Sequence, residues 1–210
     1  MNEEGKRQAK AAGEALKNVR FDKAYSSDLI RTQETCRLIL EQNAVPESNL
    51  SIDANVLIKE QSFGVLENTL ASDLFALAKK QGVGITAFVP EGGESREEVK
   101  VRGRKFLLDT LIPDVRMDPD QPHVLMVSHG VFLFELFRVL FEELGCKPPN
   151  NTPKEDLKKW ARNTSWSRFQ FEIDVDTLHI KDLKCLQSWT EDHLHQSSEN
   201  VCLCGVCPPS

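Results

Sequence analysis

The residues Ser128-His129-Gly130 follow an uninterrupted apolar run at positions 124–127. Such a run predicts a strand that is buried on both faces, and the residues after it predict a tight turn into a helix over 131–144. His129 and free backbone N–H groups would then lie at the carboxyl end of a central strand, which is where open α/β sheets bind anionic ligands. A lone histidine that only hydrogen-bonds at a strand end is the simpler interpretation of this residue taken by itself.

Two further residues have side chains suited to chemistry on an anion. Arg31 lies in the first turns of a predicted helix that Ser27 or Asp28 can cap, and a guanidinium there can bind a phosphate through two parallel hydrogen bonds. Glu60 lies at a predicted strand-to-loop junction, where a carboxyl group in a pocket can be held protonated and act as a general acid. A surface arginine that pairs with Asp28 or Glu34, and a solvated glutamate, are the simpler interpretations of each residue alone.

The length and charge of the chain limit the kinds of partner it can have. Its 210 residues are enough for one α/β domain with a sizeable core. The formal net charge of −6 argues against nucleic acid as the main ligand, because a duplex-binding face needs a basic stripe. No window approaches the roughly 20 apolar residues of a membrane span, and the first residues do not form a secretory signal. We therefore expect a cytoplasmic monomer that binds a small phosphorylated metabolite.

Apolar periodicity predicts helices and strands that alternate along the chain. Helices are predicted over 3–16, 28–41, 68–80 and 95–112, and strands over 21–26 and 52–58. Alternating apolar residues predict a strand over 165–175 that pairs with 178–186 after a turn. This order fits a three-layer α/β/α sandwich with a mixed, mostly parallel sheet. We expect residues 1–195 to form this domain and residues 196–210 to be a flexible tail.

The predicted tail contains three closely spaced cysteines, Cys202, Cys204 and Cys207. Their spacing is typical of zinc ligands, and His193 or His195 could supply the fourth ligand of a tetrahedral site. A disordered tail with incidental thiols is the simpler interpretation, so we expect no metal.

The candidate residues occur in an order that resembles a known set of motifs. The motifs are Ser27-Asp28-Leu29-Ile30-Arg31-Thr32, Glu60 with Phe63-Gly64, Pro90-Glu91-Gly92-Gly93-Glu94 and Val127-Ser128-His129-Gly130. This set resembles the histidine phosphatase superfamily, also called phosphoglycerate mutase-like. Within it, the chain is most similar to the TIGAR-type fructose-2,6-bisphosphatase branch. The resemblance covers residues 1–195.

The resemblance implies a phosphomonoesterase that acts on a sugar bisphosphate through a phosphohistidine intermediate and lowers glycolytic flux. By matching positions, Arg31 would bind the phosphate, and Gly130 would offer its backbone N–H beside it. Glu60 would protonate the leaving oxygen, and His129 would stabilise charge on the transferring phosphoryl group. This division of roles suits phosphoryl transfer, which needs a cationic cradle and a proton for the departing alkoxide. No metal or other cofactor is implied.

The chain departs from the family pattern at the nucleophile. In the family this histidine lies in an Arg-His-Gly-Glu motif on a first, central strand, upstream of the helix with which the present sequence begins. We therefore expect this strand to be missing. Each buried backbone group left unpaired on its neighbours would cost about 1–3 kcal/mol of stability. We also expect phosphatase turnover to be negligible. The sequence gives no reason to assign the role of this nucleophile to any of the other four histidines, His123, His179, His193 and His195. A non-catalytic phosphate-binding pseudo-phosphatase or scaffold, and a phosphoglycerate mutase or broad phosphatase, are the alternatives.

A second departure lies beside the predicted acid. Lys59 and Gln61 flank Glu60, whereas the family usually has arginine on both sides. The loss of one positive charge is expected to weaken phosphate binding near Glu60, which leaves the substrate assignment open.

Overall fold

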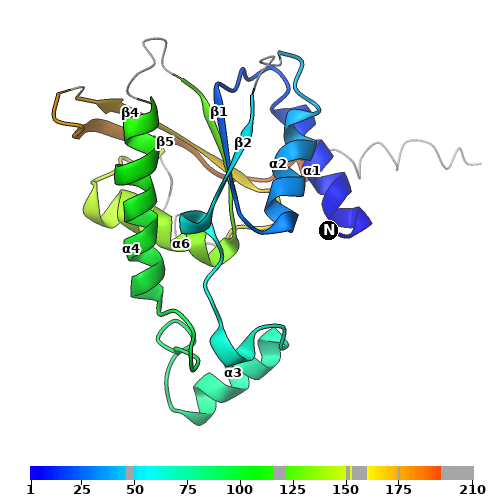
Figure 1. The fold of residues 1–210 in the computed structure, drawn as a ribbon, viewed down its shortest axis with the longest axis vertical. Helices are drawn as coiled ribbons and strands as arrows, with labels where there is room; N and C mark the ends of the chain where they lie inside the picture. The colour runs from blue at the N-terminus through cyan, green and yellow to red at the C-terminus, as the bar shows by residue number, and fades with distance from the viewer. Residues whose placement is uncertain (46–49, 116–121, 150–151, 153–159, 175, 195–210) are drawn as a thin grey trace, which may run out of the picture.

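The computed structural model describes residues 1–45, 50–115, 122–149, 152, 160–174 and 176–194. Its strands form two sheets (Figure 1). In the first, β1 (Lys23–Ser27) pairs in parallel with β2 (Ile52–Asn55) on one side and with β3 (Val124–Val127) on the other. In the second, β4 (Trp166–Ile173) and β5 (Ile180–Thr190) form an antiparallel pair. The predicted tail, with its three cysteines, lies outside the described residues.

The helices cover both faces of the parallel sheet. Their bounds are α1 Glu3–Ala15, α2 Ile30–Leu40, α3 Ala71–Lys80, α4 Arg96–Phe106, α5 Ile112–Val115 and α6 Gly130–Arg138. Helices α1 and α2 lie on one side of the sheet, and α4 and α6 lie on the other (Figure 1). The predicted α/β fold class is confirmed, although its strands form two sheets instead of one. In the described part of the chain, no helix is long and apolar enough to span a membrane.

Two hydrophobic cores lie on opposite faces of the parallel sheet. The side chains of β1 alternate, so that Ala24 packs in the core beside α1 and α2, and Tyr25 packs in the core beside α4 and α6. The strand β3 alternates in the same way, with Leu125 in the first core and Met126 against the second. The second core also contains Leu183 of β5, so the antiparallel pair packs on the same hydrophobic cluster. This alternation is the period-two pattern of strands that are covered on both faces.

The edge position of β3 corrects the expectation of a central strand. Both faces of β3 are covered, but in the described ranges it pairs with β1 alone. Accordingly Val124, Met126 and Val127 are only partly buried. A continuous apolar run indicates that both faces of a strand are covered. It does not indicate whether the strand lies at the centre or the edge of the sheet, which depends on the strands paired with it.

Local hydrogen bonds explain where several elements begin and end. Helix α4 begins after a capping box, in which the Ser95 hydroxyl accepts from the Glu98 N–H over 3.2 Å and the Glu98 carboxylate accepts from the Ser95 N–H over 2.7 Å. Helix α2 begins two residues later than predicted, with Leu29 as N-cap, because the Ser27 hydroxyl accepts from the Leu29 N–H before the helix starts. The predicted strand over 52–58 stops at Asn55, whose side chain accepts from the Leu57 N–H and closes a short 3₁₀ turn.

Two predicted long helices change their winding near their ends. The segment predicted over 95–112 is α-helical to Phe106, π-helical over Leu107–Leu111 and then continues as α5. The segment predicted over 131–144 is α6 followed by a π-helix over Val139–Glu143. Apolar periodicity does not distinguish i→i−4 from i→i−5 hydrogen bonding, so these π segments were not predicted.

The lobe that contains α3 projects away from the sheet (Figure 1) and is anchored where its two ends meet. Gly64 has a φ of +53°, and a Cβ at this position would collide with the Glu91 carbonyl oxygen. The neighbouring Val65 N–H donates to that same oxygen over 3.0 Å, and the Glu94 N–H donates to Ser62 O over 2.9 Å. Glycine is therefore needed at position 64, where the loop after Glu60 meets the turn before α4.

Replacement of Phe106 tests the core that holds β1 and α4 together. Its side chain is 1% exposed, and its ring packs edge-on against Tyr25 with 5.3 Å between centroids. We expect Phe106→Ala to lower the free energy of unfolding by about 3–5 kcal/mol in urea titrations, because it leaves a cavity. The matched control is Phe75→Ala, which removes a ring that is 57% exposed and should cost less than about 1 kcal/mol. Equal losses for the two variants would contradict this packing.

Candidate functional site

His129 lies at the carboxyl end of β3, as the sequence predicts, and is the N-cap residue of α6. Its backbone is extended, and its carbonyl accepts from the Leu133 N–H over 2.9 Å, so the chain turns directly from strand into helix. The preceding Ser128 donates its hydroxyl to Ile58 O over 2.6 Å. This bond ties the turn to the segment that leads to Glu60. The His129 side chain is 7% exposed, which makes it one of the few buried polar residues of the described chain.

Arg31 contacts His129 directly and determines which ring nitrogen carries the proton. Nη2 of Arg31 lies 3.0 Å from Nδ1 of His129. Because a guanidinium can only donate, Nδ1 must accept, so the neutral ring carries its proton on Nε2. Burial, followed by the positive charge of Arg31, lowers the pKa of His129 to about 4, although Asp28 acts in the opposite direction. The imidazole is therefore neutral at pH 7.

The Nε2–H of His129 is a buried donor without a hydrogen-bond partner in the described part of the protein. An unsatisfied buried donor costs about 1–3 kcal/mol. An oxygen of a bound anion would satisfy it, and the guanidinium of Arg31 is already beside the ring to neutralise the added charge. The pair is therefore suited to bind a phosphate group.

Glu60 lies over the amino end of α6. Its carboxylate accepts long hydrogen bonds from Val131 N–H (3.4 Å) and Phe132 N–H (3.3 Å), and a shorter one from the Gln61 N–H (2.9 Å). The first two donors belong to the first turn of α6, where backbone N–H groups have no partner within the helix. The helix that His129 caps thus also holds the carboxyl group of Glu60.

Gly130 is the first residue of α6, between His129 and the two amides that hold Glu60. In the described structure its N–H makes no hydrogen bond, and a Cβ placed on it would meet no atom within 4 Å. The backbone is therefore open at this point. All four predicted site residues come together at the amino end of α6, while their individual roles stay predictions.

Arg102 was missed by the sequence reasoning, although it holds the loop that contains Glu60. Its guanidinium donates to three carbonyl groups, those of Leu57 (2.9 Å), Lys59 (2.7 Å) and Glu60 (3.0 Å). It also forms a two-point contact with the Glu94 carboxylate, at 2.9 and 3.1 Å. The signal was the carboxylate of Glu94 just before the N-cap of α4, with an arginine eight residues later on that helix.

Hydrogen bonds from Arg102 and from the backbone of Ser62 favour the ionised form of Glu94. Burial acts to raise the pKa of Glu94, but the hydrogen bonds from Arg102 and from the Ser62 N–H outweigh it and lower the pKa below its usual value. Gln61, which departs from the family pattern, is also part of this support. Its side chain is buried and donates to Glu94 O over 2.6 Å. The neutral residue at position 61 thus has a structural role in the loop of Glu60.

The other described histidines lie away from this site. His123 precedes β3 at the opposite end of that strand, where its N–H donates to Asp22. His179 lies in the turn between β4 and β5, where its carbonyl accepts from Asp174. His193 contacts the Thr164 hydroxyl at 3.2 Å. His195 lies outside the described residues.

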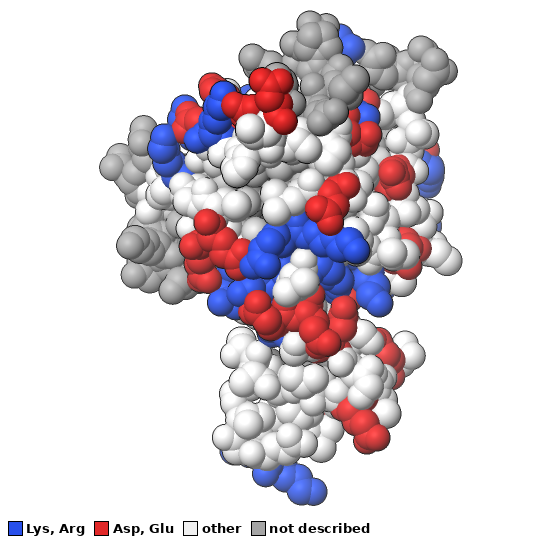
Figure 2. Space-filling view, turned by 60° about the vertical axis from the view of Figure 1, so that its left-hand side comes forward, with Lys and Arg blue, Asp and Glu red and all other residues white. Residues whose placement is uncertain are grey.

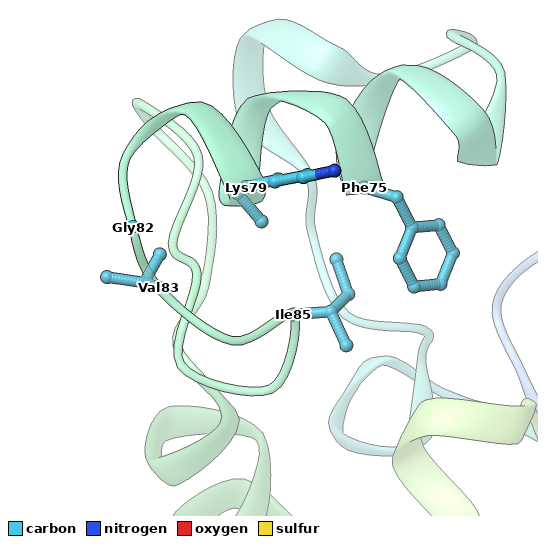
Figure 3. Close-up of a pocket in the computed structure, with 6 residues that line it drawn as sticks. Phe75, Lys79, Gly82, Val83 and Ile85 are labelled. Carbon is cyan, nitrogen blue, oxygen red and sulfur yellow. The ribbon is translucent and has the colours of Figure 1, made fainter.

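A separate apolar hollow of about 430 Å³ lies in the α3 lobe (Figure 3). It is lined by Phe75, Ala78, Lys79, Gly82, Val83 and Ile85. These residues lie on α3 and the loop after it, and none of the predicted site residues is among them. In the part of the chain that the structure describes, no group of three or more His, Cys, Asp or Glu side chains could hold a metal ion.

Comparisons with known proteins match most of the chain. The sequence model of a family described as "Histidine phosphatase superfamily (branch 1)" matches residues 1–181. The chain is 29% identical to the "Fructose-2,6-bisphosphatase TIGAR" of Mus musculus in an alignment of 239 positions, which covers 95% of this chain and 88% of the relative. It is 37% identical to the protein of the same name from Xenopus laevis in an alignment of 237 positions, which covers 92% of this chain and 85% of the relative.

The fold also matches solved structures. One is described as "Crystal structure of phosphoglycerate mutase from Bacillus anthracis str. Sterne", with a TM-score of 0.72 at 21% identity, covering 94% of this chain and 85% of that one. The fold is thus of the phosphoglycerate mutase-like α/β class. With its family match, the chain belongs to the histidine phosphatase superfamily, and by family it is a phosphatase.

The contact between Arg31 and His129 predicts a measurable change in the histidine titration. We expect Arg31→Gln to raise the pKa of His129 above about 4, because the positive charge that disfavours the imidazolium is removed. NMR titration of the His129 side-chain nitrogens measures this value and also identifies the Nε2–H tautomer. Arg37→Gln, which removes an exposed arginine paired with Glu41 on the same helix, should leave the pKa unchanged. A titration near 6.5 in the unsubstituted protein would contradict the geometry.

Proposed function

We propose that this chain carries the phosphate site of a phosphomonoesterase of the fructose-2,6-bisphosphatase type, at the amino end of α6. The observation that carries this proposal is the convergence of Arg31, His129 and Glu60 on one helix terminus. Helix amino ends favour anions. The Arg31 guanidinium and the His129 Nε2–H add donors that a bound anion can use. The relatives from Mus musculus and Xenopus laevis are named fructose-2,6-bisphosphatases, which supports a phosphorylated sugar as the substrate.

Each group has a part in the proposed reaction. The Nε2–H of His129, the guanidinium of Arg31 and the N–H of Gly130 donate to the oxygens of the transferring phosphoryl group and offset its developing charge. Glu60 gives a proton to the leaving oxygen as the bond from phosphorus to that oxygen breaks. Because the donors are held in place before substrate binds, they need little reorganisation during the reaction.

A phosphohistidine mechanism also needs an imidazole nitrogen that is free to attack phosphorus. His129 does not meet this need, because Nδ1 accepts from Arg31 and Nε2 carries the proton. His123, His179 and His193 lie elsewhere in the described structure. We therefore propose that residues 1–210 bind phosphate but release it from esters at a negligible rate. Turnover then requires one more histidine, which would form the bond to phosphorus that water later hydrolyses.

The free edge of β3 is suited to bring such a histidine to the site. In the described ranges this edge has no paired strand, so its N–H and C=O groups can accept a further parallel strand. The carboxyl ends of neighbouring parallel strands lie at the same edge of a sheet. A histidine at the end of the added strand would therefore lie next to His129.

A second candidate function is phosphate binding without catalysis. The same observation favours it, because the described site has cationic and N–H donors around an anion position but one imidazole only. A protein of this kind would bind a phosphorylated metabolite and release it unchanged. The two candidates differ in whether a nucleophile can restore turnover.

Phosphate release by two forms of the chain distinguishes the candidates. One form is residues 1–210, and the other carries a strand with the family's Arg-His-Gly-Glu motif joined ahead of Met1. With fructose 2,6-bisphosphate, we expect release near the buffer rate from the first and enzymatic turnover from the second. In the extended form, Glu60→Gln should lower turnover by about 10²–10⁴-fold, because the leaving oxygen loses its proton donor. The matched control is Glu41→Gln, at an exposed ion pair after α2.

Three results would contradict parts of this account. Rapid release by residues 1–210 alone would show that the proposed need for another histidine is wrong. Turnover of phosphoglycerates but not of sugar bisphosphates by the extended form would rule out the bisphosphatase assignment. An extended form that binds phosphate but stays inactive would favour the non-catalytic candidate.

A further inference from the structure

Arg96 is a second, unassigned cationic group beside the site. It is the first residue of α4, and its side chain is 12% exposed on the seam between α4 and α6. Nη1 lies 3.5 Å from the Glu135 carboxylate, and the guanidinium carbon lies 5.0 Å from the centre of the Trp160 ring. Trp160 is itself stacked on Phe134 of α6, with 4.9 Å between ring centres. These contacts hold the plane of the Arg96 guanidinium in one orientation.

The guanidinium of Arg96 has an ion pair with Glu135 but a buried nitrogen without a hydrogen bond in the described part of the protein. Nη1 is buried without a hydrogen-bond partner, and the 3.5 Å ion pair is longer than a good N–H···O bond. Its acidic partner Glu135 is 2% exposed and is shared with Arg138, which donates to it over 3.1 Å. A guanidinium has five N–H donors, so Arg96 has donors left to bind a ligand. A fixed, buried and unsatisfied guanidinium is suited to bind an anion.

The position of Arg96 follows from the order of contacts along α6. His129 caps this helix, Glu60 lies over the amides of Val131 and Phe132, and Glu135 is four residues further on. Four residues of α-helix span about 6 Å, which places the partner of Arg96 about one turn beyond the amides that hold Glu60. Burial lowers the pKa of Arg96, whereas the negative charges of Glu135 and Glu60 act to raise it, which agrees with this proximity.

Basic side chains also gather on one face of the molecule. Figure 2 shows Lys and Arg side chains in a band across its middle, above the lobe that contains α3, with acidic side chains around the band. An anionic substrate can therefore approach a positive area in spite of the negative net charge of the chain.

We propose, resting on the proposed function, that Arg96 binds the second phosphate of a bisphosphate substrate. If Arg31 and His129 hold the transferring phosphoryl group and Glu60 faces the leaving oxygen, the rest of the substrate extends from Glu60 toward Arg96. A guanidinium can bind a phosphate through two parallel hydrogen bonds, which an ammonium group cannot reproduce. A monophosphate leaves Arg96 unsatisfied, so this residue selects doubly phosphorylated substrates.

Calorimetric titration of residues 1–210 tests this role without the need for turnover. The probes are fructose 2,6-bisphosphate, fructose 6-phosphate and inorganic phosphate. We expect Arg96→Gln to weaken binding of the bisphosphate by at least about tenfold, and binding of the other two probes by no more than about twofold. The matched control is Arg104→Gln on the same helix, whose side chain pairs with Glu143 and should leave all three affinities unchanged.

A conservative variant separates binding from folding. Arg96→Lys keeps a positive charge beside Glu135 but loses the planar fork, so it should fold and lose part of the affinity for the bisphosphate only. Thermal unfolding followed by circular dichroism checks that each variant is folded. If Arg96→Gln does not fold, an unchanged affinity of Arg96→Lys for the bisphosphate would overturn the proposal.

The failure of this inference differs from failure of the proposed function. Arg31→Gln should weaken binding of all three probes, because it removes the phosphate site itself. If it does so while Arg96→Gln leaves bisphosphate binding unchanged, or weakens all three probes equally, the role of Arg96 is wrong and the proposed function stands. If the unsubstituted chain binds none of the probes, both the phosphate site and the role of Arg96 are contradicted.

Discussion

The free N–H groups at the amino end of α6 are the feature on which the site depends. They hold the carboxylate of Glu60, and the N-cap residue just before them is His129. The parallel pairing of β1 with β3 sets Ser26 opposite Val127, so the chain segments after these two strands emerge side by side and Arg31 reaches His129. A shift in this pairing by one residue would exchange the two faces of the strands and separate these groups.

The charges at the site are arranged so that a neutral histidine lies between cationic groups. Arg31 occupies Nδ1 of His129 and helps to keep the imidazole unprotonated, which leaves a buried Nε2–H as a donor. Arg102 uses its guanidinium on the carbonyl groups around Glu60 and on Glu94. One arginine therefore organises the loop, while Arg31 is exposed enough to meet a ligand. This division explains how a chain with a net negative charge can present a local site for an anion.

Much of this arrangement was predictable from the sequence, because motif residues at strand ends need only the parallel order of strands to meet. His129, Arg31 and Glu60 were candidates from their places in the predicted elements, the resemblance to the histidine phosphatase superfamily selected them as a set, and the structure brings them together. Arg102 and Arg96 were not, since their contacts depend on how α4 crosses α6 and on the course of the loop between residues 57 and 61. The edge position of β3 was also missed, because its apolar residues reflect covered faces and carry no information on lateral neighbours.

The most direct measurement is a crystal structure of residues 1–210 with orthovanadate, an anion that imitates the transferring phosphoryl group. The account predicts vanadate oxygens within hydrogen-bonding distance of His129 Nε2, the Arg31 guanidinium and the Gly130 N–H, with Glu60 facing the anion. Vanadate bound at another place on the protein, or an empty α6 terminus at saturating vanadate, would contradict the central claim that this helix end is the phosphate site.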